Sequence, residues 1–165
     1  MSPLLAICGP TASGKSAVAV EICRQIGGEV VSADSMQIYR GMDIGTAKPD
    51  AAERRAVKHH LLDIADPGEK FSAAAYKEAA LAAIAEISAR GATPVLCGGT
   101  GLYIDALTKP YRFSIQGGGE ARARYEAIAE EADGKARLHA MLRAVDPESA
   151  ARQHVNDVRR VVRAL

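Results

Sequence analysis

The sequence predicts an α/β fold in which a parallel sheet is flanked by helices, and three observations support this prediction. Short apolar runs at 4–8, 29–34 and 94–99 have the length of buried strands. Segments with helical spacing alternate with these runs, as they do in parallel α/β sheets. A glycine-rich loop joins the first run to the first helical segment.

The elements follow in chain order. A helix is predicted from the glycine-rich loop to Gly27-Gly28, and a long loop is predicted over 35–50. A helix over 51–60 and a short strand over 60–64 come next. The clearest helical pattern runs over 71–91, with Ser72 as its N-cap and Gly91 just past its end. A further helix follows the strand at 94–99 and stops at Pro110.

The composition changes after residue 113. Residues 114–165 contain no convincing strand, and they predict a Gly-rich link followed by two or three helices, the last beginning at Asn156. No glycine, proline or polar tail ends this last helix. The sequence therefore predicts an α/β core at 1–113 and a helical region at 114–165 that is truncated.

The stretch GPTASGKS matches the phosphate-binding pattern G-x-x-x-x-G-K-[ST]. Its glycines let backbone N–H groups curl around an anion, and the helix that follows adds its dipole. Lys15 would supply a charge to the phosphates, and the hydroxyl of Ser16 would bind Mg²⁺. The predicted phosphate-binding residues are Gly9, Pro10, Thr11, Ala12, Ser13, Gly14, Lys15 and Ser16. This pattern alone leaves kinase, NTPase switch and group transferase open.

Polar residues follow two predicted strands at the edge of the sheet where ligands bind. Asp34 and Ser35 come after the strand at 29–34, and Thr100 comes after the strand at 94–99. Asp34 is a candidate general base or metal ligand, and the alternative is that it caps a turn. Asp63 resembles the acidic metal residue of many phosphate-loop sites. His59 and His60 are adjacent, so their side chains diverge and they are not expected to form a metal pair.

Composition excludes several classes of protein. The chain has 165 residues, a net charge of +1 and no tryptophan, so neither a global basic field nor an aromatic platform for single strands is present. The three cysteines show no C-x-x-C spacing, which favours small buried thiols in a reducing cytoplasm over a disulfide framework. No apolar run reaches the ~20 residues of a membrane span.

The motifs together resemble the tRNA dimethylallyltransferases, also called tRNA isopentenyltransferases. The residues that carry the resemblance are, in order, GPTASGKS, VVSADSMQIYRGMDIGTAKP, HHLLDI, GGTGLY and NDVRRVVRAL. The resemblance is weakest over Ser114 to Gly119, and the family is about twice the length of this chain. It implies a P-loop NTPase-like core followed by part of a helical insertion domain that embraces the anticodon stem-loop of tRNA.

The resemblance also implies the chemistry. The phosphate loop would hold the diphosphate of dimethylallyl diphosphate with Mg²⁺, and the five-carbon group would pass to the exocyclic amine of an adenine beside the anticodon. Asp34 would accept a proton from that amine, and Thr100 would orient the reacting groups. The residues implied in tRNA binding are Asp34, Ser35, Met36, Gln37, Arg122 or Arg124, Arg159, Arg160, Val161, Val162 and Arg163.

Two other interpretations stay open at this stage. One is a P-loop small-molecule kinase that uses ATP, although small-molecule kinases do not carry the segment DSMQIYRGMDIGTAKP. The other is a folded fragment that binds an anion without catalysis. Under the transferase interpretation we expect a cytoplasmic monomer that has no contact with a membrane.

Overall fold

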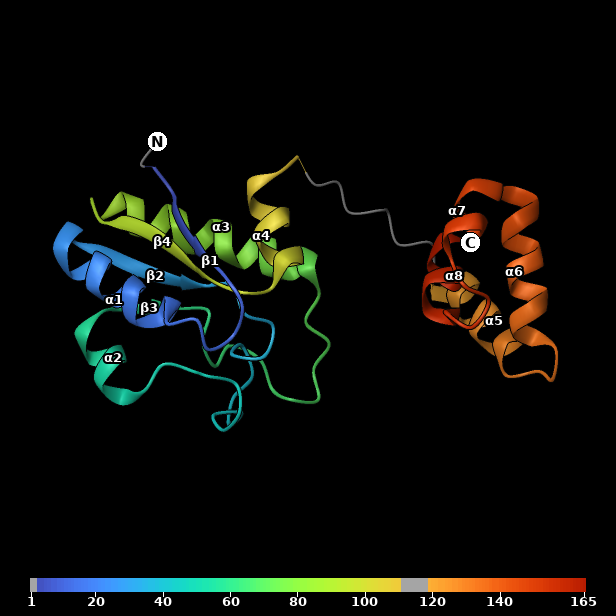
Figure 1. Cartoon of the computed structure of the whole chain (residues 1–165), viewed down its shortest axis with the longest axis horizontal. Coiled ribbons are helices and arrows are strands. Elements are labelled where there is room, and N and C mark those ends of the chain that lie inside the picture. Colours follow the sequence, from blue (N-terminus) through green and yellow to red (C-terminus); the bar gives the residue numbers. More distant parts are fainter. Residues whose placement is uncertain (1–2, 111–118) are drawn as a thin grey trace. The chain divides into compact units, whose positions relative to one another are not determined.

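A computed structural model describes residues 3–110 and 119–165 of the chain (Figure 1). The chain divides into two compact units, Met1–Phe113 and Ser114–Leu165, which we call unit 1 and unit 2. Within the described ranges, no helix is both long enough and apolar enough to cross a membrane.

Unit 1 is built on a four-stranded parallel sheet, as predicted. Its strands are β1 (Leu5–Cys8), β2 (Gly28–Ser32), β3 (His59–His60) and β4 (Thr93–Gly98), in the order β1-β4-β2-β3. The register pairs Val95 of β4 with Leu5 of β1 on one side and with Val30 of β2 on the other. Because all four strands are parallel, their carboxyl ends lie at one edge of the sheet.

Helices cover both faces of this sheet. They are α1 (Lys15–Ile26), α2 (Ala51–Ala56), α3 (Ala73–Ala89) and α4 (Gly101–Thr108). Successive residues of a strand point to opposite faces, so Val30 packs with α1 while Val31 packs with α3 and α4. The predicted caps of the longest helix are confirmed: Ser72 accepts a hydrogen bond from the amide of Ala75, and Gly91 has the left-handed φ of 78° that is typical just past a helix end.

Two strand predictions need correction. The strand at 4–8 was expected to be buried, but Leu5, Ala6 and Cys8 are exposed because β1 is an edge strand that pairs only with β4. The strand expected at 60–64 is confined to His59–His60. Leu61 and Asp63 have positive φ angles of 62° and 56°, which end the extended run.

Unit 2 is helical in its described part. Its helices are α5 (Gly119–Ala129), α6 (Gly134–Val145), α7 (Pro147–Arg152) and α8 (Val158–Ala164). The described part of unit 2 thus has four helices, where two or three were predicted. The last begins at Val158 instead of Asn156, because the side chain of Asp157 caps it. The Gly-rich link predicted over 114–119 lies outside the described residues except for Gly119. The core consists of Leu138, Leu142, Ala150, Val161 and Val162.

A cluster of polar and charged side chains links the amino end of β2 to β3 and to the end of α3. The Glu29 carboxylate, 16% exposed, accepts hydrogen bonds from Arg90 at 2.8 and 3.0 Å and contacts His60 Nε2 at 2.6 Å. Burial opposes the charge of Glu29, but the hydrogen bonds from His60 and Arg90 outweigh burial and lower its pKa.

Glu29→Gln is therefore expected to lower the free energy of unfolding at neutral pH by about 1–3 kcal/mol, because the Arg90 guanidinium loses its ionised partner. A carboxylate whose pKa is lowered by folding contributes stability above its unfolded pKa and loses it as the pH falls. The difference in unfolding free energy between variant and wild type should thus shrink as the pH falls below 4.5, the ordinary pKa of glutamate. Urea unfolding at several pH values measures this, and a difference independent of pH would contradict it.

Candidate active site

The phosphate loop spans Gly9 to Ser16, between β1 and α1. Ala12 and Gly14 have left-handed φ angles of 63° and 78°, so the backbone curls tightly before the helix begins. Among the described residues, no side chain caps the first turn of α1, and this turn carries no acidic residue. Its amides and the positive end of the helix dipole are therefore available to an anion.

Two predicted phosphate ligands, Lys15 and Ser16, line a small cavity with Asp34 and Gln37. Lys15 Nζ donates a hydrogen bond to the Pro10 carbonyl at 2.9 Å, which folds the lysine back onto its own loop. The cavity has a volume of about 10 Å³, the space of a single water molecule. A diphosphate can enter it only if the lining side chains move.

Asp34 follows β2 and is half-buried. Its Oδ1 accepts hydrogen bonds from the amides of Met36 at 2.9 Å and Gln37 at 3.4 Å, so Asp34 does cap a turn, as the alternative held. Within the described ranges, its Oδ2 has no hydrogen-bond partner. One carboxylate thus has one oxygen that fixes the turn and another that is free to accept a proton.

Thr100 joins the end of β4 to the end of β2. Its Oγ1 accepts from the Ser35 amide at 2.9 Å and donates to Ser35 Oγ at 3.3 Å. The two strands approach closely here because Gly98 has no side chain: a Cβ at this position would lie 2.3 Å from the Ala33 carbonyl oxygen. The structure therefore brings the predicted catalytic residues Asp34 and Thr100 to the same edge of the sheet.

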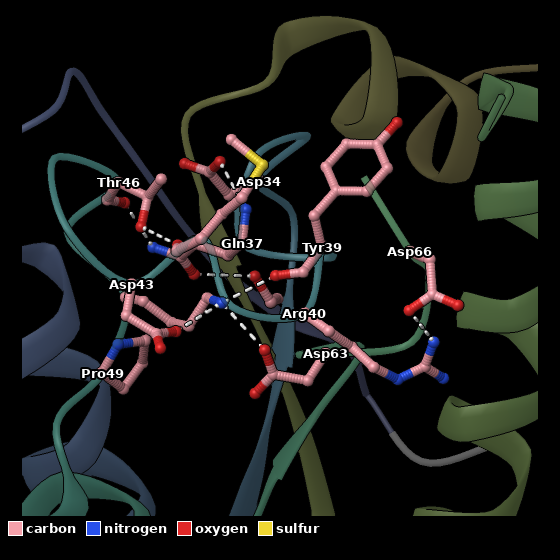
Figure 2. Close-up of polar contacts among 12 residues, drawn as sticks. Asp34, Gln37, Tyr39, Arg40, Asp43, Thr46, Pro49, Asp63 and Asp66 are labelled. Atoms are coloured by element: carbon pink, nitrogen blue, oxygen red, sulfur yellow. Dashed lines mark hydrogen bonds and ion pairs between the residues drawn. The ribbon is translucent and has the colours of Figure 1, made fainter. Parts of the chain in front are cut away.

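Gln37 is 9% exposed and its amide group is fully engaged. Nε2 donates to the carbonyls of Thr46 at 3.2 Å and Ala47 at 2.9 Å, while Oε1 accepts from Ser32 Oγ at 3.0 Å. Figure 2 shows Gln37 turned toward Thr46. Its side chain holds the loop together, so it cannot grip an extruded base without breaking these bonds, whereas Met36 beside it is 45% exposed.

The cavity is also lined by seven residues that sequence reasoning did not assign to the site: Ala19, Val30, Ser32, Pro49, His59, Cys97 and Gly98. His59 Nδ1 lies 2.8 Å from the Val57 carbonyl, which fixes the proton on Nδ1 and leaves Nε2 as an acceptor. Burial lowers the pKa of His59. The sequence signal that could have identified His59 is its place beside His60. Adjacent residues of a strand point to opposite faces of the sheet, and here His60 contacts Glu29 while His59 lines the cavity.

Both carboxylate oxygens of Asp63 are engaged by cationic side chains. Its Oδ1 accepts from Lys48 and its Oδ2 from Arg54, both at 2.8 Å. The three cysteines are free thiols, and the expectation that all three are buried holds for Cys23 and Cys97 but is wrong for Cys8. Cys8 is exposed next to Gly9, whereas burial raises the pKa of Cys23 and of Cys97 to about 11.

The arginines predicted to contact tRNA lie on unit 2. Arg159, Arg160 and Arg163 are exposed on α8, and Arg122 is exposed on α5, where it pairs with Glu126. In the part of the chain that the structure describes, no carboxylate pairs with Arg159 or Arg163. Val161 and Val162 are only 1% and 8% exposed and pack in the core of unit 2, which does not fit side-chain contacts with tRNA.

Comparisons with known proteins identify a family. The family model described as IPP transferase matches residues 37–165. A tRNA dimethylallyltransferase of Anaeromyxobacter sp. (strain Fw109-5) is 53% identical over 165 residues, which are 100% of this chain and 55% of that protein. Another, from Desulforudis audaxviator, is 52% identical over 163 residues and is covered to 52%.

Two solved structures of enzymes with the same described activity are also similar to this chain. The full-length tRNA isopentenylpyrophosphate transferase of Bacillus halodurans is 46% identical with a TM-score of 0.67, over 99% of this chain and 54% of that one. A eukaryotic dimethylallyltransferase described as acting on tRNA is 30% identical with a TM-score of 0.83, over 98% of this chain and 40% of that one. This chain thus spans about half the length of the curated relatives it matches. Since the family model covers more than half of the sequence, the chain belongs to the IPP transferase family.

Proposed function

We propose that this protein transfers a dimethylallyl group from dimethylallyl diphosphate to the exocyclic amine of the adenine beside the anticodon of tRNA. The observation that carries the proposal is that Lys15 and Ser16 of the phosphate loop share a cavity with Asp34. Transfer of the dimethylallyl group needs a site for the diphosphate anion and a carboxylate with a free oxygen. Membership of the IPP transferase family favours this reaction over phosphate transfer from ATP.

The proposed reaction forms one bond and breaks another at the same carbon atom. The adenine nitrogen forms a bond to the allylic carbon, the bond from that carbon to oxygen breaks, and diphosphate leaves with the electron pair. Asp34 takes the proton that the amine loses. Lys15 and the loop amides stabilise the charge that develops on the diphosphate. Thr100, bonded to Ser35, keeps the end of β4 beside the carboxylate.

Mg²⁺ fits the donors at this site. It prefers hard oxygen ligands and usually takes only one or two from the protein and the rest from phosphates and water. Ser16 and Asp34 offer a hydroxyl and a carboxylate at the cavity, and no group of three or more His, Cys, Asp or Glu side chains that could hold a metal occurs in the described ranges. Bound there by Ser16, Mg²⁺ would neutralise charge on the leaving diphosphate.

tRNA is the proposed acceptor, and the exposed arginines of α5 and α8 are its proposed contacts on unit 2. Arg159, Arg163 and Arg122 would neutralise phosphates of the anticodon stem-loop. The adenine must leave its stack to reach Asp34. Three free cysteines suit the reducing cytoplasm, where we place the protein.

Ligand binding tests the first step of this proposal. In thermal unfolding with Mg²⁺, dimethylallyl diphosphate and inorganic diphosphate should raise the midpoint, because a ligand that binds only the folded state stabilises it. ATP should raise it less. Transfer is then measured as the added mass of one dimethylallyl group on an anticodon stem-loop RNA. A larger shift with ATP, together with no transfer, would favour the kinase.

A further inference from the structure

Lys48 is a buried cation in the long loop that precedes α2. Its side chain is 2% exposed, although the surrounding segment has no regular secondary structure. Nζ donates hydrogen bonds to the Tyr39 carbonyl, Asp43 Oδ1 and Asp63 Oδ1, each at 2.8 Å. An ammonium has three donors, and all three are used. Lys48 therefore has no proton left for a ligand, and we call it and its three partners the Lys48 cluster.

The Lys48 cluster ties together segments that are distant in sequence. Asp43 lies five residues before Lys48 in the same loop, and Asp63 lies fifteen residues after it. Asp63 also accepts from Arg54 of α2, whose Nε donates to the Pro49 carbonyl at 2.9 Å. Burial opposes the charge of Lys48, but its hydrogen bonds to Asp43 and Asp63 outweigh burial and raise its pKa. Lys48 therefore stays charged at neutral pH.

Two short chains of hydrogen bonds connect the Lys48 cluster to Asp34, and both include Gln37. The Asp63 amide donates to the Gln37 carbonyl at 3.3 Å. The Gln37 side chain donates to the carbonyls of Thr46 and Ala47, which immediately precede Lys48. The Gln37 amide in turn donates to Asp34 Oδ1. A shift of Lys48 would thus be transmitted to the turn that orients the Asp34 carboxylate.

The backbone beside the cluster is strained. Ala47, Leu61 and Asp63 have positive φ angles of 50°, 62° and 56°, a region that residues other than glycine seldom occupy. Such conformations persist only where surrounding contacts hold them, and they gather at functional sites. The bonds of Lys48 and Gln37 hold Asp63 and Ala47 here, whereas Leu61 packs in the core of unit 1.

We propose that Lys48 is a positioning residue for prenyl transfer: it fixes the loop and, through Gln37, holds the Asp34 carboxylate in the orientation that accepts the proton. This inference rests on the proposed function. A lysine that only stabilised the fold would affect every property of the protein through the folded fraction. A positioning lysine affects the loop and the rate constant of transfer, and it leaves diphosphate binding to Lys15 and the loop amides.

The test compares Lys48→Met, which keeps the length of the side chain without its charge, with the control Lys109→Met. Lys109 is paired with Asp105 on α4 and is 64% exposed. In Lys48→Met, we expect amide hydrogen exchange to rise over 36–47 and to stay unchanged in α3. We expect kcat of the full-length protein to fall about tenfold or more, since a misplacement of ~1 Å can cost up to ~10²-fold. Affinity for inorganic diphosphate should stay within about twofold in either variant, since Lys15 is untouched.

Asp43→Asn provides a milder variant in case Lys48→Met does not fold, because Asp43 is 65% exposed. It should change exchange and kcat in the same direction by smaller factors. Normal kcat in a folded variant with a loosened loop, or exchange that rises equally in α3, would overturn the positioning role. If wild type transfers no prenyl group, the proposed function fails, and the positioning role fails with it. The exchange pattern then still decides whether Lys48 holds the loop.

Discussion

Asp34→Asn is expected to lower kcat for prenyl transfer by about 10²- to 10⁴-fold, the usual contribution of a positioned general base. Asparagine keeps an Oδ1 that can accept from the amides of Met36 and Gln37, so the turn after β2 should survive. It has no carboxylate to take the proton of the adenine amine. The measurement is single-turnover transfer to an anticodon stem-loop RNA with saturating donor.

The control for this variant is ligand binding. Inorganic diphosphate with Mg²⁺ should still raise the thermal midpoint of Asp34→Asn, because the loop amides and Lys15 remain. If Asp34→Asn transferred at the wild-type rate, the general-base role of Asp34 would be wrong. If it lost diphosphate binding as well, Asp34 would act mainly as a ligand at the metal or phosphate site.

Lys15→Ala is expected to weaken diphosphate binding by about 10²- to 10³-fold, because removing one partner of a close charge pair costs ~2–5 kcal/mol. Isothermal titration with inorganic diphosphate measures this loss directly. The matched control is Lys58→Ala, which removes an exposed lysine beside Glu29 and Glu86. Equal affinity of Lys15→Ala and wild type would show that the loop amides alone bind the anion, and that Lys15 has no part in holding the donor.

Local patterns predicted those elements whose signals lie within a few residues. Ser72 and Gly91 bound α3 as expected, because helix caps depend on neighbouring amides and on φ at one residue. The strand and the helix that flank the phosphate loop were predicted for the same reason. The burial of β1 was predicted wrongly, because an apolar run reports hydrophobicity and not whether a strand lies at the edge of the sheet.

The features that sequence reasoning missed depend on contacts between distant segments. Lys48 lies in a polar loop, where a lysine is expected to be solvated, and only the folded chain places Asp63 beside it. Gln37 was predicted to meet a base, but its side chain bonds to Ser32, Thr46 and Ala47. The left-handed backbone at Leu61 has no sequence signal, since a leucine there is held only by its surroundings.

The three thiols of the chain differ in a way that bears on chemical labelling. Cys23 and Cys97 are buried, and their raised pKa values keep them protonated near neutral pH, the form that reacts slowly with alkylating reagents. Cys8 is exposed and directly precedes Gly9. In this structure the natural sequence therefore carries one accessible attachment point for a fluorophore or spin label. It lies next to the phosphate loop, and no cysteine has to be added or removed to use it.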